Sequence, residues 1–484
     1  MKNNFLLSII FLIGCSNTHK EYTIQEFMNT TSFGGSSFSH DEKSIIIRSN
    51  QSGVNNAFEI DLITSDSKQL TFSDSNSISP ISYFPNDKRF LFRSDQGGNE
   101  IWHIYLFNLD GTTIDLTPGE QSRSLFLKWA NDKKSFFFTS NKRNPKYMDL
   151  YEMSIDSFKS AIIFKNDNAL NIGDISKNKR YLALSKAYTR DNSDLYLYSF
   201  DNKSLTKILF EDVDVNHNPA GFSINSETLY FVTDLNSEFR YLKKYNIKSG
   251  KVETVQKESW DIVANYFSDS GKYRITTINK DSQTEIKILD TSSGKHLKLP
   301  KMPRGNISSV NISKSESLIS FYHGSSQSPM NLYYYKIGSR KPSRLTNSMN
   351  PLIDEKHLGE AQIIRYNSLD GLEIPAIYYK PPQANKGNKV PAIVRVHGGP
   401  GGQARVGYRA STQYLVNNGY AVLDINNRGS SGYGKTFQTL DDQAHGKGDL
   451  DDCVAAVDWL KSQNHINGEN IGILGGSYGG YMVM

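Results

Sequence analysis

The sequence has few cysteines, no long apolar run beyond its first residues, and no large excess of one charge. Only Cys15 and Cys453 occur in 484 residues, which excludes a disulfide framework and a structural zinc site. No later apolar stretch is long enough to span a bilayer, and collagen-like and coiled-coil repeats are missing. The 55 basic and 50 acidic residues give a net charge of +5 without a dense basic block, so a nucleic-acid partner is not expected.

The remaining composition is that of a globular protein with more than one domain. Aromatic residues make up 12% of the chain and hydrophobic residues 37%, which is too apolar for a solvated coil. At roughly 100–200 residues per domain, the length predicts two or three domains.

The N-terminus reads MKNNFLLSIIFLIGCSNTHK, with a basic start and a short apolar core at residues 5–13. Such a segment is too short to span a bilayer and is typical of a secretory signal. LIGC at 12–15 resembles the lipobox of bacterial lipoproteins, which predicts a signal peptide over 1–14, a lipid on Cys15 and a mature segment over 15–30. The protein would then be lipid-anchored in a bacterial cell envelope, outside the cytoplasm. A plain signal peptide with an incidental cysteine is the alternative, and a buried first strand fits the polar flanks poorly.

A pattern of about 45 residues recurs seven times between residues 31 and 352. Each copy has a hydrophobic anchor, a polar turn and an apolar run, as in FSHDEKSIII and WANDKKSFFF. The spacings between anchors are 46, 45, 46, 47, 45 and 45 residues. The anchors are Phe38, Phe84, Trp129, Ile175, Phe222, Phe267 and Ile312.

Several short β-rich runs and turn signals fill each copy, so we predict a seven-bladed β-propeller over 31–352. A large β-sandwich with irregular repeats is the alternative. The fold alone assigns no function to this region. Four histidines lie at differing offsets in the repeats, which favours surface or interface positions over metal ligation; they are His103, His217, His296 and His323.

Residues 353–484 have a sequence pattern typical of an α/β domain. A hairpin is expected from 361–367 and 374–379 around Asp370-Gly371, and buried strands from 392–396, 421–425 and 471–474. Residues 449–463 predict a helix with an apolar stripe that contains Leu450, Cys453, Val454, Val457 and Leu460. The three aspartates at its start suit the positive end of the helix dipole.

The sequence GGSYGG at 475–480 follows the last of these strands and precedes an incipient helix. This is the context of a G-x-S-x-G nucleophile elbow, in which Ser477 would project from a sharp turn. A serine hydroxyl needs a histidine base, and the oxyanion needs backbone N–H donors. Tyr478 supplies one donor, and the HGGP loop at 397–400 lies where the other is expected. A purely structural Gly-rich turn is the alternative.

Four motifs in this order resemble the prolyl oligopeptidase family of serine peptidases, in its acylaminoacyl-peptidase and dipeptidyl-peptidase-like branch. They are HGGP at 397–400, NNRGSSGYG at 426–434, GKGDLDD at 446–452 and GGSYGGYM at 475–482. The resemblance implies Ser477 as the acyl-forming nucleophile and the amides of Tyr478 and Gly399 as the oxyanion hole. His397, Gly398 and Arg428 would shape the active-site loops, and the propeller would restrict access to short peptides. No cofactor or metal is implied.

The chain departs from that family in one respect. The order of the triad is serine, acid, histidine, yet only seven residues follow Ser477 and none is Asp or His. His397 is accounted for by the oxyanion loop, and His445 has no better claim. We therefore expect an N-terminal fragment with an incomplete hydrolase domain and little activity by itself.

Three functions follow from these features. The leading hypothesis is a serine peptidase that hydrolyses short peptides through an acyl-enzyme on Ser477. The second is an esterase on the same fold. The third is a catalytically inert propeller lipoprotein that binds partners at the envelope surface.

Overall fold

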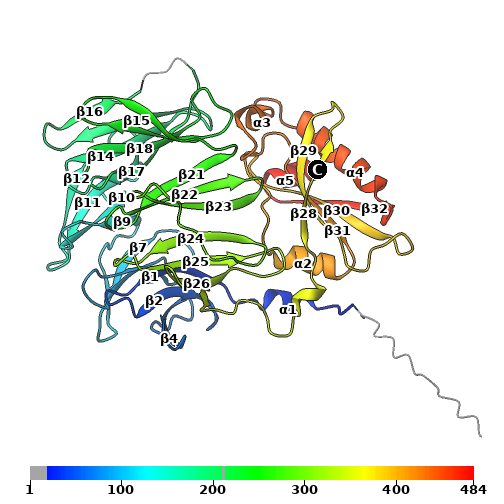
Figure 1. Cartoon of the computed structure of the whole chain (residues 1–484), viewed down its shortest axis with the longest axis horizontal. Coiled ribbons are helices and arrows are strands. Elements are labelled where there is room, and N and C mark those ends of the chain that lie inside the picture. The colour runs from blue at the N-terminus through cyan, green and yellow to red at the C-terminus, as the bar shows by residue number, and fades with distance from the viewer. Residues whose placement is uncertain (1–18, 210–212) are drawn as a thin grey trace, which may run out of the picture.

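The structure is a computed structural model that describes residues 19–209 and 213–484. It consists of a β-propeller and an α/β domain seated on one end of it (Figure 1). The predicted signal peptide and Cys15 lie outside the described residues. No helix of the described part is long and apolar enough to cross a membrane.

Seven separate sheets form the propeller, which confirms the predicted blades. The inner strand of each blade ends at its predicted anchor, except in the second blade, where it ends one residue before Phe84. The inner strands are β1 (Phe33–Phe38), β5 (Ser79–Tyr83), β9 (Ser124–Trp129), β13 (Asn171–Ile175), β17 (His217–Phe222), β21 (Asp261–Phe267) and β24 (Asn306–Ile312).

The other strands follow in antiparallel order within each blade. The second strands are β2 (Ser44–Ser49), β6 (Phe90–Ser94), β10 (Ser135–Ser140), β14 (Tyr181–Ala187), β18 (Thr228–Thr233), β22 (Tyr273–Lys280) and β25 (Leu318–Gly324). The third are β3 (Asn56–Asp61), β7 (His103–Phe107), β11 (Asp149–Ser154), β15 (Ser193–Ser199), β19 (Tyr241–Asn246), β23 (Gln283–Asp290) and β26 (Asn331–Lys336). The outer strands are β4 (Ser67–Gln69), β8 (Thr113–Asp115), β12 (Ser160–Phe164), β16 (Ser204–Lys207), β20 (Val252–Gln256) and β27 (Ser343–Arg344). In the sixth blade a single bridge between Leu289 and His296 stands in place of an outer strand.

The polar turn after each inner strand has a recurring backbone conformation. In six of the seven blades the residue four places after the anchor has a positive φ, which is the left-handed conformation of a tight turn. These residues are Glu42, Lys133, Lys179, Ser226, Gly271 and Glu316. The repeat therefore fixes the turn geometry as well as the strands.

Side chains, not a shared strand, join the first and last blades in the described structure. Ile45 and Ile47 pack with Tyr322 and Leu332 in one buried cluster. The Tyr322 hydroxyl also donates to the carbonyl of Gly35 at 2.7 Å. Closure of the ring therefore depends on burial of these apolar side chains.

The α/β domain contains a five-stranded sheet in the order β28-β29-β31-β30-β32. Strands β30, β31 and β32 are parallel, whereas the β28–β29 hairpin is antiparallel. The strands are β28 (Ala361–Asn367), β29 (Glu373–Tyr379), β30 (Val390–Val396), β31 (Ala421–Ile425) and β32 (Ile466–Gly475). The helices are α2 (Ala410–Asn417), α3 (Lys435–Thr439), α4 (Gly448–Ser462) and α5 (Tyr478–Val483), with a 3-10 turn η1 (Glu355–His357) before the sheet.

The predicted helix over 449–463 is present as α4, but its apolar stripe is partly wrong. Leu450 and Val454 are 42% and 46% exposed, whereas Asp449 and Asp452 are fully buried. The buried face of α4 therefore differs from the predicted face and carries these two carboxylates. There they accept hydrogen bonds from side chains that are distant in the sequence. Cys453 is a buried core residue, as predicted, and burial raises the pKa of its thiol to about 12.

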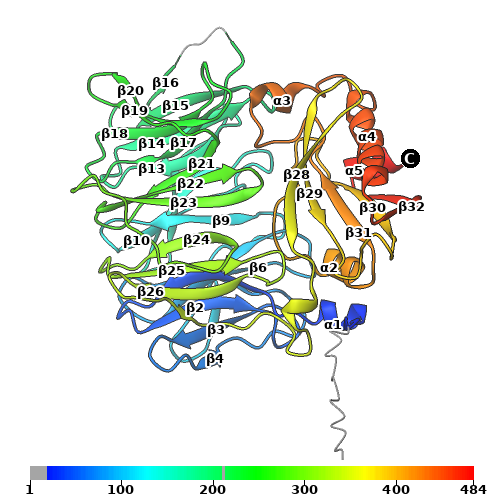
Figure 2. The same ribbon diagram turned by 45° about the vertical axis from the view of Figure 1, so that its right-hand side comes forward.

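The segment before the propeller packs on the α/β domain. Helix α1 (Ile24–Met28) lies against α2, with Phe27 and Tyr22 buried in a shared cluster (Figure 2). Asn417 of α2 also accepts from the Tyr22 N–H at 2.7 Å. The chain thus contacts the α/β domain before and after the propeller.

Candidate active site

Ser477 lies on a sharp turn between β32 and α5. Its φ of 56° and ψ of −123° are strained values for a residue with a side chain. The side chain is exposed, and its hydroxyl makes no hydrogen bond to any described residue. The sequence-based prediction of an elbow therefore describes the local backbone geometry.

Glycine permits close packing under this turn. A β-carbon at Gly479 would lie 2.2 Å from the carbonyl oxygen of Val396, the last residue of β30. Because β30 and β32 are adjacent parallel strands, their carboxyl ends bring the elbow and the HGGP loop together. The glycine at 479 is therefore a steric requirement of the elbow.

The HGGP loop borders the candidate nucleophile. A β-carbon at Gly398 would lie 3.2 Å from Cβ and 3.7 Å from Oγ of Ser477. Among the described residues, no acceptor takes a hydrogen bond from the N–H of Gly399 or of Tyr478. Two free N–H groups beside an exposed serine are what an oxyanion requires.

His397 is held within the loop and makes no hydrogen bond to Ser477. Its Nδ1 donates to the carbonyl of Gly398 at 2.8 Å, and its Nε2 lies 2.8 Å from Oγ of Ser430. Burial lowers the pKa of this imidazole. His397 is thus held in place by Gly398 of its own loop and by Ser430.

Tyr478 links the elbow to α4. Its hydroxyl donates to the Asp449 carboxylate, which also accepts from the N–H of Lys447 at 2.8 Å. The ring of His445 meets the Tyr478 ring edge-on at 5.3 Å. Within the described chain, no histidine hydrogen-bonds to the Ser477 hydroxyl.

The guanidinium of Arg428 holds its loop in place through ion pairs. Its guanidinium pairs with the buried Asp452 at 2.8 Å and with Asp370 at 2.8 Å. The backbone N–H of Arg428 also donates to the Asp452 carboxylate at 2.7 Å. These contacts turn the guanidinium toward α4 and the β28–β29 hairpin, and the side chain is 11% exposed.

Family models match both parts of the chain. The Prolyl oligopeptidase N-terminal beta-propeller domain matches residues 66–347, and the Prolyl oligopeptidase family matches residues 406–484. The chain belongs to the prolyl oligopeptidase family. This confirms the resemblance drawn from the motifs.

Curated relatives in the prolyl oligopeptidase family are longer than this chain. Dipeptidyl aminopeptidase BIII of Pseudoxanthomonas mexicana is 26% identical over 422 residues, which cover 83% of this chain and 60% of the relative. A prolyl endopeptidase of Elizabethkingia meningoseptica is 23% identical over 449 residues, covering 86% and 61%. The chain thus spans about 60% of the length of these relatives.

Solved structures share the fold. A structure from a study of two prolyl endopeptidases has a TM-score of 0.76 at 16% identity, covering 95% of this chain and 70% of that chain. A puromycin hydrolase has a TM-score of 0.77 at 15% identity, covering 95% and 76%.

The propeller of this prolyl oligopeptidase family member contacts the α3 segment and the HGGP loop through Arg190, in the turn between β14 and β15. Arg190 Nη2 donates to the carbonyl of Gln438 and to Asp442, both at 2.6 Å. A β-carbon at Gly401 would lie 2.9 Å from Arg190 Nη1. No sequence motif marks Arg190, because its partners lie more than 200 residues away.

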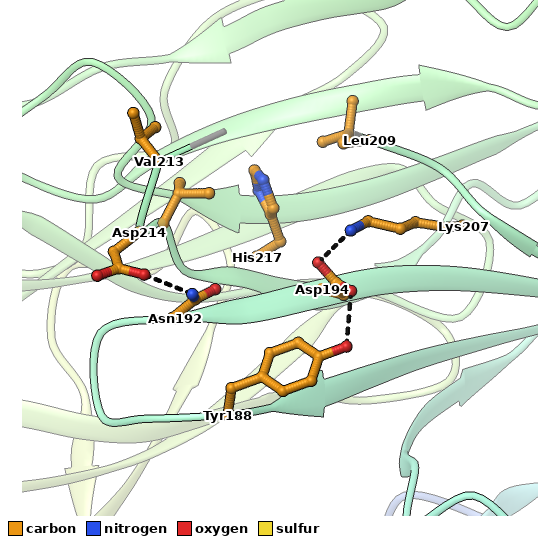
Figure 3. Close-up of a pocket in the computed structure, with 9 residues that line it drawn as sticks. Tyr188, Asn192, Asp194, Lys207, Leu209, Val213, Asp214 and His217 are labelled. Atoms are coloured by element: carbon orange, nitrogen blue, oxygen red, sulfur yellow. Dashed lines mark hydrogen bonds and ion pairs between the residues drawn. The ribbon is translucent and has the colours of Figure 1, made fainter. Parts of the chain in front are cut away.

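A cavity of about 500 Å³ lies beside β17, between the fourth and fifth blades (Figure 3). His217 is 2% exposed there, and neither ring nitrogen has a hydrogen-bond partner among the described residues. Burial lowers its pKa to about 4. Nearby, Asp194 pairs with Lys207 at 2.8 Å. Residues 19–209 and 213–484 contain no group of three or more His, Cys, Asp or Glu side chains suited to a metal ion.

Proposed function

We propose that this protein is a serine peptidase that hydrolyses short peptides through an acyl-enzyme on Ser477. The observation that carries the proposal is the exposed Ser477 on its strained turn, beside the free N–H groups of Tyr478 and Gly399. The hydroxyl would attack the scissile carbonyl, and the two N–H groups would hold the oxyanion. Membership of the prolyl oligopeptidase family supports the same chemistry.

A base is needed to take the hydroxyl proton, and no described histidine is hydrogen-bonded to Ser477. We therefore propose that residues 1–484 alone hydrolyse peptides slowly or not at all. Reading the coding DNA past the codon for Met484 tests this point. An open frame with an Asp and then a His after strands would support the peptidase, and a stop codon would favour the inert alternative.

A fluorophosphonate probe tests the nucleophile directly. In the protein encoded by the complete reading frame, labelling and peptide turnover are expected to disappear in Ser477→Ala and to persist in Ser462→Ala, an exposed serine on α4. Labelling that survives Ser477→Ala would refute the assignment.

Matched ester and amide substrates separate a peptidase from an esterase. A peptidase must protonate a poor amine leaving group, so it keeps substantial amide activity, whereas an esterase does not. We further propose specificity within the dipeptidyl and acylaminoacyl branch, with the propeller limiting substrate size. Comparing dipeptidyl, N-acyl and longer peptide substrates checks that specificity.

We also propose that lipidation of Cys15 anchors the protein in a bacterial envelope. The lipobox-like LIGC sequence supports this. The protein is expected to enter the detergent phase in Triton X-114 partitioning, and Cys15→Ser to move it to the aqueous phase. Detergent partitioning that survives the substitution would contradict the anchor.

A further inference from the structure

Asp449, in the first turn of α4, is a fully buried carboxylate with no ion-pair partner among the described residues. A buried charge is unfavourable unless hydrogen bonds replace the water that it loses. Three backbone N–H groups supply such bonds, from Gly446, Lys447 and Leu450 at 3.2, 2.8 and 3.1 Å. The fourth donor is the hydroxyl of Tyr478. The turn around Asp449 therefore fixes the carboxylate, and the carboxylate in turn holds Tyr478.

The bond between Asp449 and Tyr478 joins the start of α5 to the start of α4. No other hydrogen bond links these two helices in the described part of the chain. A hydrogen bond to an ionised acceptor is shorter and stronger than one between neutral groups. Burial and this bond both raise the pKa of Tyr478, so its hydroxyl remains a donor. The side chain of Tyr478 is therefore tied to one fixed point.

Tyr478 directly follows the strained position of the candidate nucleophile. Ser477 has a φ of 56° and a ψ of −123°, and such a conformation persists only where the surrounding structure holds it. Gly479 lies against the carbonyl of Val396, which holds α5 from the side of β30. The bond to Asp449 holds α5 from the side of α4. Because the ψ of Ser477 sets the plane of the peptide group that carries the Tyr478 N–H, relaxation of the elbow would turn this N–H away.

We infer that Asp449 is a positioning residue of the oxyanion hole, which fixes the direction of the Tyr478 N–H through the Tyr478 hydroxyl. Asp449 itself would touch neither the substrate nor the reacting atoms. An N–H aimed at the oxyanion stabilises the transition state more than the bound substrate, so a loss of aim lowers kcat and leaves KM nearly unchanged. The role in catalysis rests on the proposed function, whereas the hold on the Tyr478 N–H does not.

Tyr478→Phe tests this role in the protein encoded by the complete reading frame. The substitution removes the hydroxyl and keeps both the ring and the backbone N–H. With a peptide substrate, kcat is expected to fall about tenfold and KM to change by less than about twofold. Asp449→Asn should also lower kcat, and the double variant should lose no more than the worse single variant, because both substitutions act on one hydrogen bond. A loss that lies wholly in KM would overturn the role.

Tyr481→Phe is the matched control. Tyr481 lies in the same helix and is 51% exposed, and its hydroxyl has no hydrogen-bond partner among the described residues. The control should keep the kcat and KM of the unsubstituted protein. An equal fall of kcat in Tyr481→Phe, or an unchanged kcat in Tyr478→Phe, would show that the bond to Asp449 does not position the oxyanion donor.

A thiono substrate separates positioning from a general loss of stability. Sulfur is a weaker hydrogen-bond acceptor than oxygen, so the N–H groups of the oxyanion hole stabilise a thiono substrate less. The unsubstituted protein should therefore hydrolyse a dipeptide ester faster than the matching thionoester. This preference should shrink in Tyr478→Phe and Asp449→Asn and persist in Tyr481→Phe. A lower melting temperature with an unchanged preference would mean a purely structural role and would overturn the inference.

Hydrogen exchange of the 484-residue chain tests the hold on Tyr478 without catalysis. The N–H groups of Gly480 and Tyr481 donate to the carbonyl of Ser477 at 2.9 and 3.2 Å, so their exchange reports opening of the elbow. It should be about tenfold faster in Tyr478→Phe and in Asp449→Asn and unchanged in Tyr481→Phe.

Equal exchange in all four proteins would overturn the hold on Tyr478. Faster exchange in the two variants, together with a complete protein that hydrolyses neither peptides nor esters, would refute the proposed function and leave that hold standing.

Discussion

Arg190 of the propeller donates to Asp442 of the α/β domain at 2.6 Å, and its guanidinium also lies against the loop that contains Gly401. One side chain thus connects the fourth blade to the loop beside Ser477. The same guanidinium lies 3.3 Å from Asp441, whose side chain is buried. We therefore expect the loop that contains Gly401 to depend on the contact between the propeller and the α/β domain for its ordered conformation.

Arg190→Ala is expected to loosen the loop at 398–403. Loss of the guanidinium removes the Asp441 and Asp442 contacts and leaves a buried carboxylate without its cation. Hydrogen exchange in this loop should become about tenfold faster, which corresponds to about 1.4 kcal/mol. Arg180→Ala is the control, because Arg180 pairs with an exposed Asp201 elsewhere in the propeller. Unchanged exchange in Arg190→Ala would show that the loop is ordered without the propeller.

Gly479→Ala is expected to destabilise the elbow. The new methyl group would lie 2.2 Å from the Val396 carbonyl, so β30 and α5 must move apart. Urea unfolding should show a loss of about 1–3 kcal/mol. In Gly472→Ala, at a β32 position with open space around it, stability should be unchanged or slightly higher. Equal stability of the two variants would contradict close packing at 479.

Arg428→Ala is expected to lower the free energy of unfolding by about 3–5 kcal/mol, because the buried Asp452 would keep its charge without a cationic partner. Asp370→Ala removes the exposed partner of the same arginine. It should lower the free energy of unfolding by only a small fraction of the loss expected for Arg428→Ala. Urea midpoints of the two variants provide the measurement. A larger loss in Asp370→Ala would mean that the exposed pair is the stronger one.

His217 predicts a pH dependence of stability. Its pKa is about 4 in the folded chain against an ordinary value of 6.5, so below pH 6.5 the unfolded chain binds the proton more readily. The free energy of unfolding should therefore fall as the pH drops from 6.5 to 4, by on the order of 3 kcal/mol from this residue. Urea unfolding at several pH values should show a flatter profile for His217→Gln. His296→Gln, at an exposed histidine, should keep the original slope.

Local patterns in the sequence determined the repeating architecture and the elbow. Six inner strands end at their predicted anchors, and β31 has the predicted bounds of Ala421–Ile425. Strand alternation and turn residues act within a few positions of one another, so they can be read without knowledge of the fold. The GGSYGG motif likewise predicts the strand–turn–helix geometry around Ser477 because its glycines are neighbours of that turn.

Tertiary structure alone decided which charges meet and which side chains are buried. Asp449 and Asp452 were expected only to favour the start of α4, yet they are buried against Tyr478 and Arg428. Such contacts replace the water lost on burial, and their donors come from distant segments. Ring closure likewise sets the Tyr322 hydroxyl beside the Gly35 carbonyl, a contact that depends on where seven blades bring the first and last sheets. The periodic pattern of a sequence relates neighbouring positions only, so it cannot predict a contact with a residue in a distant segment.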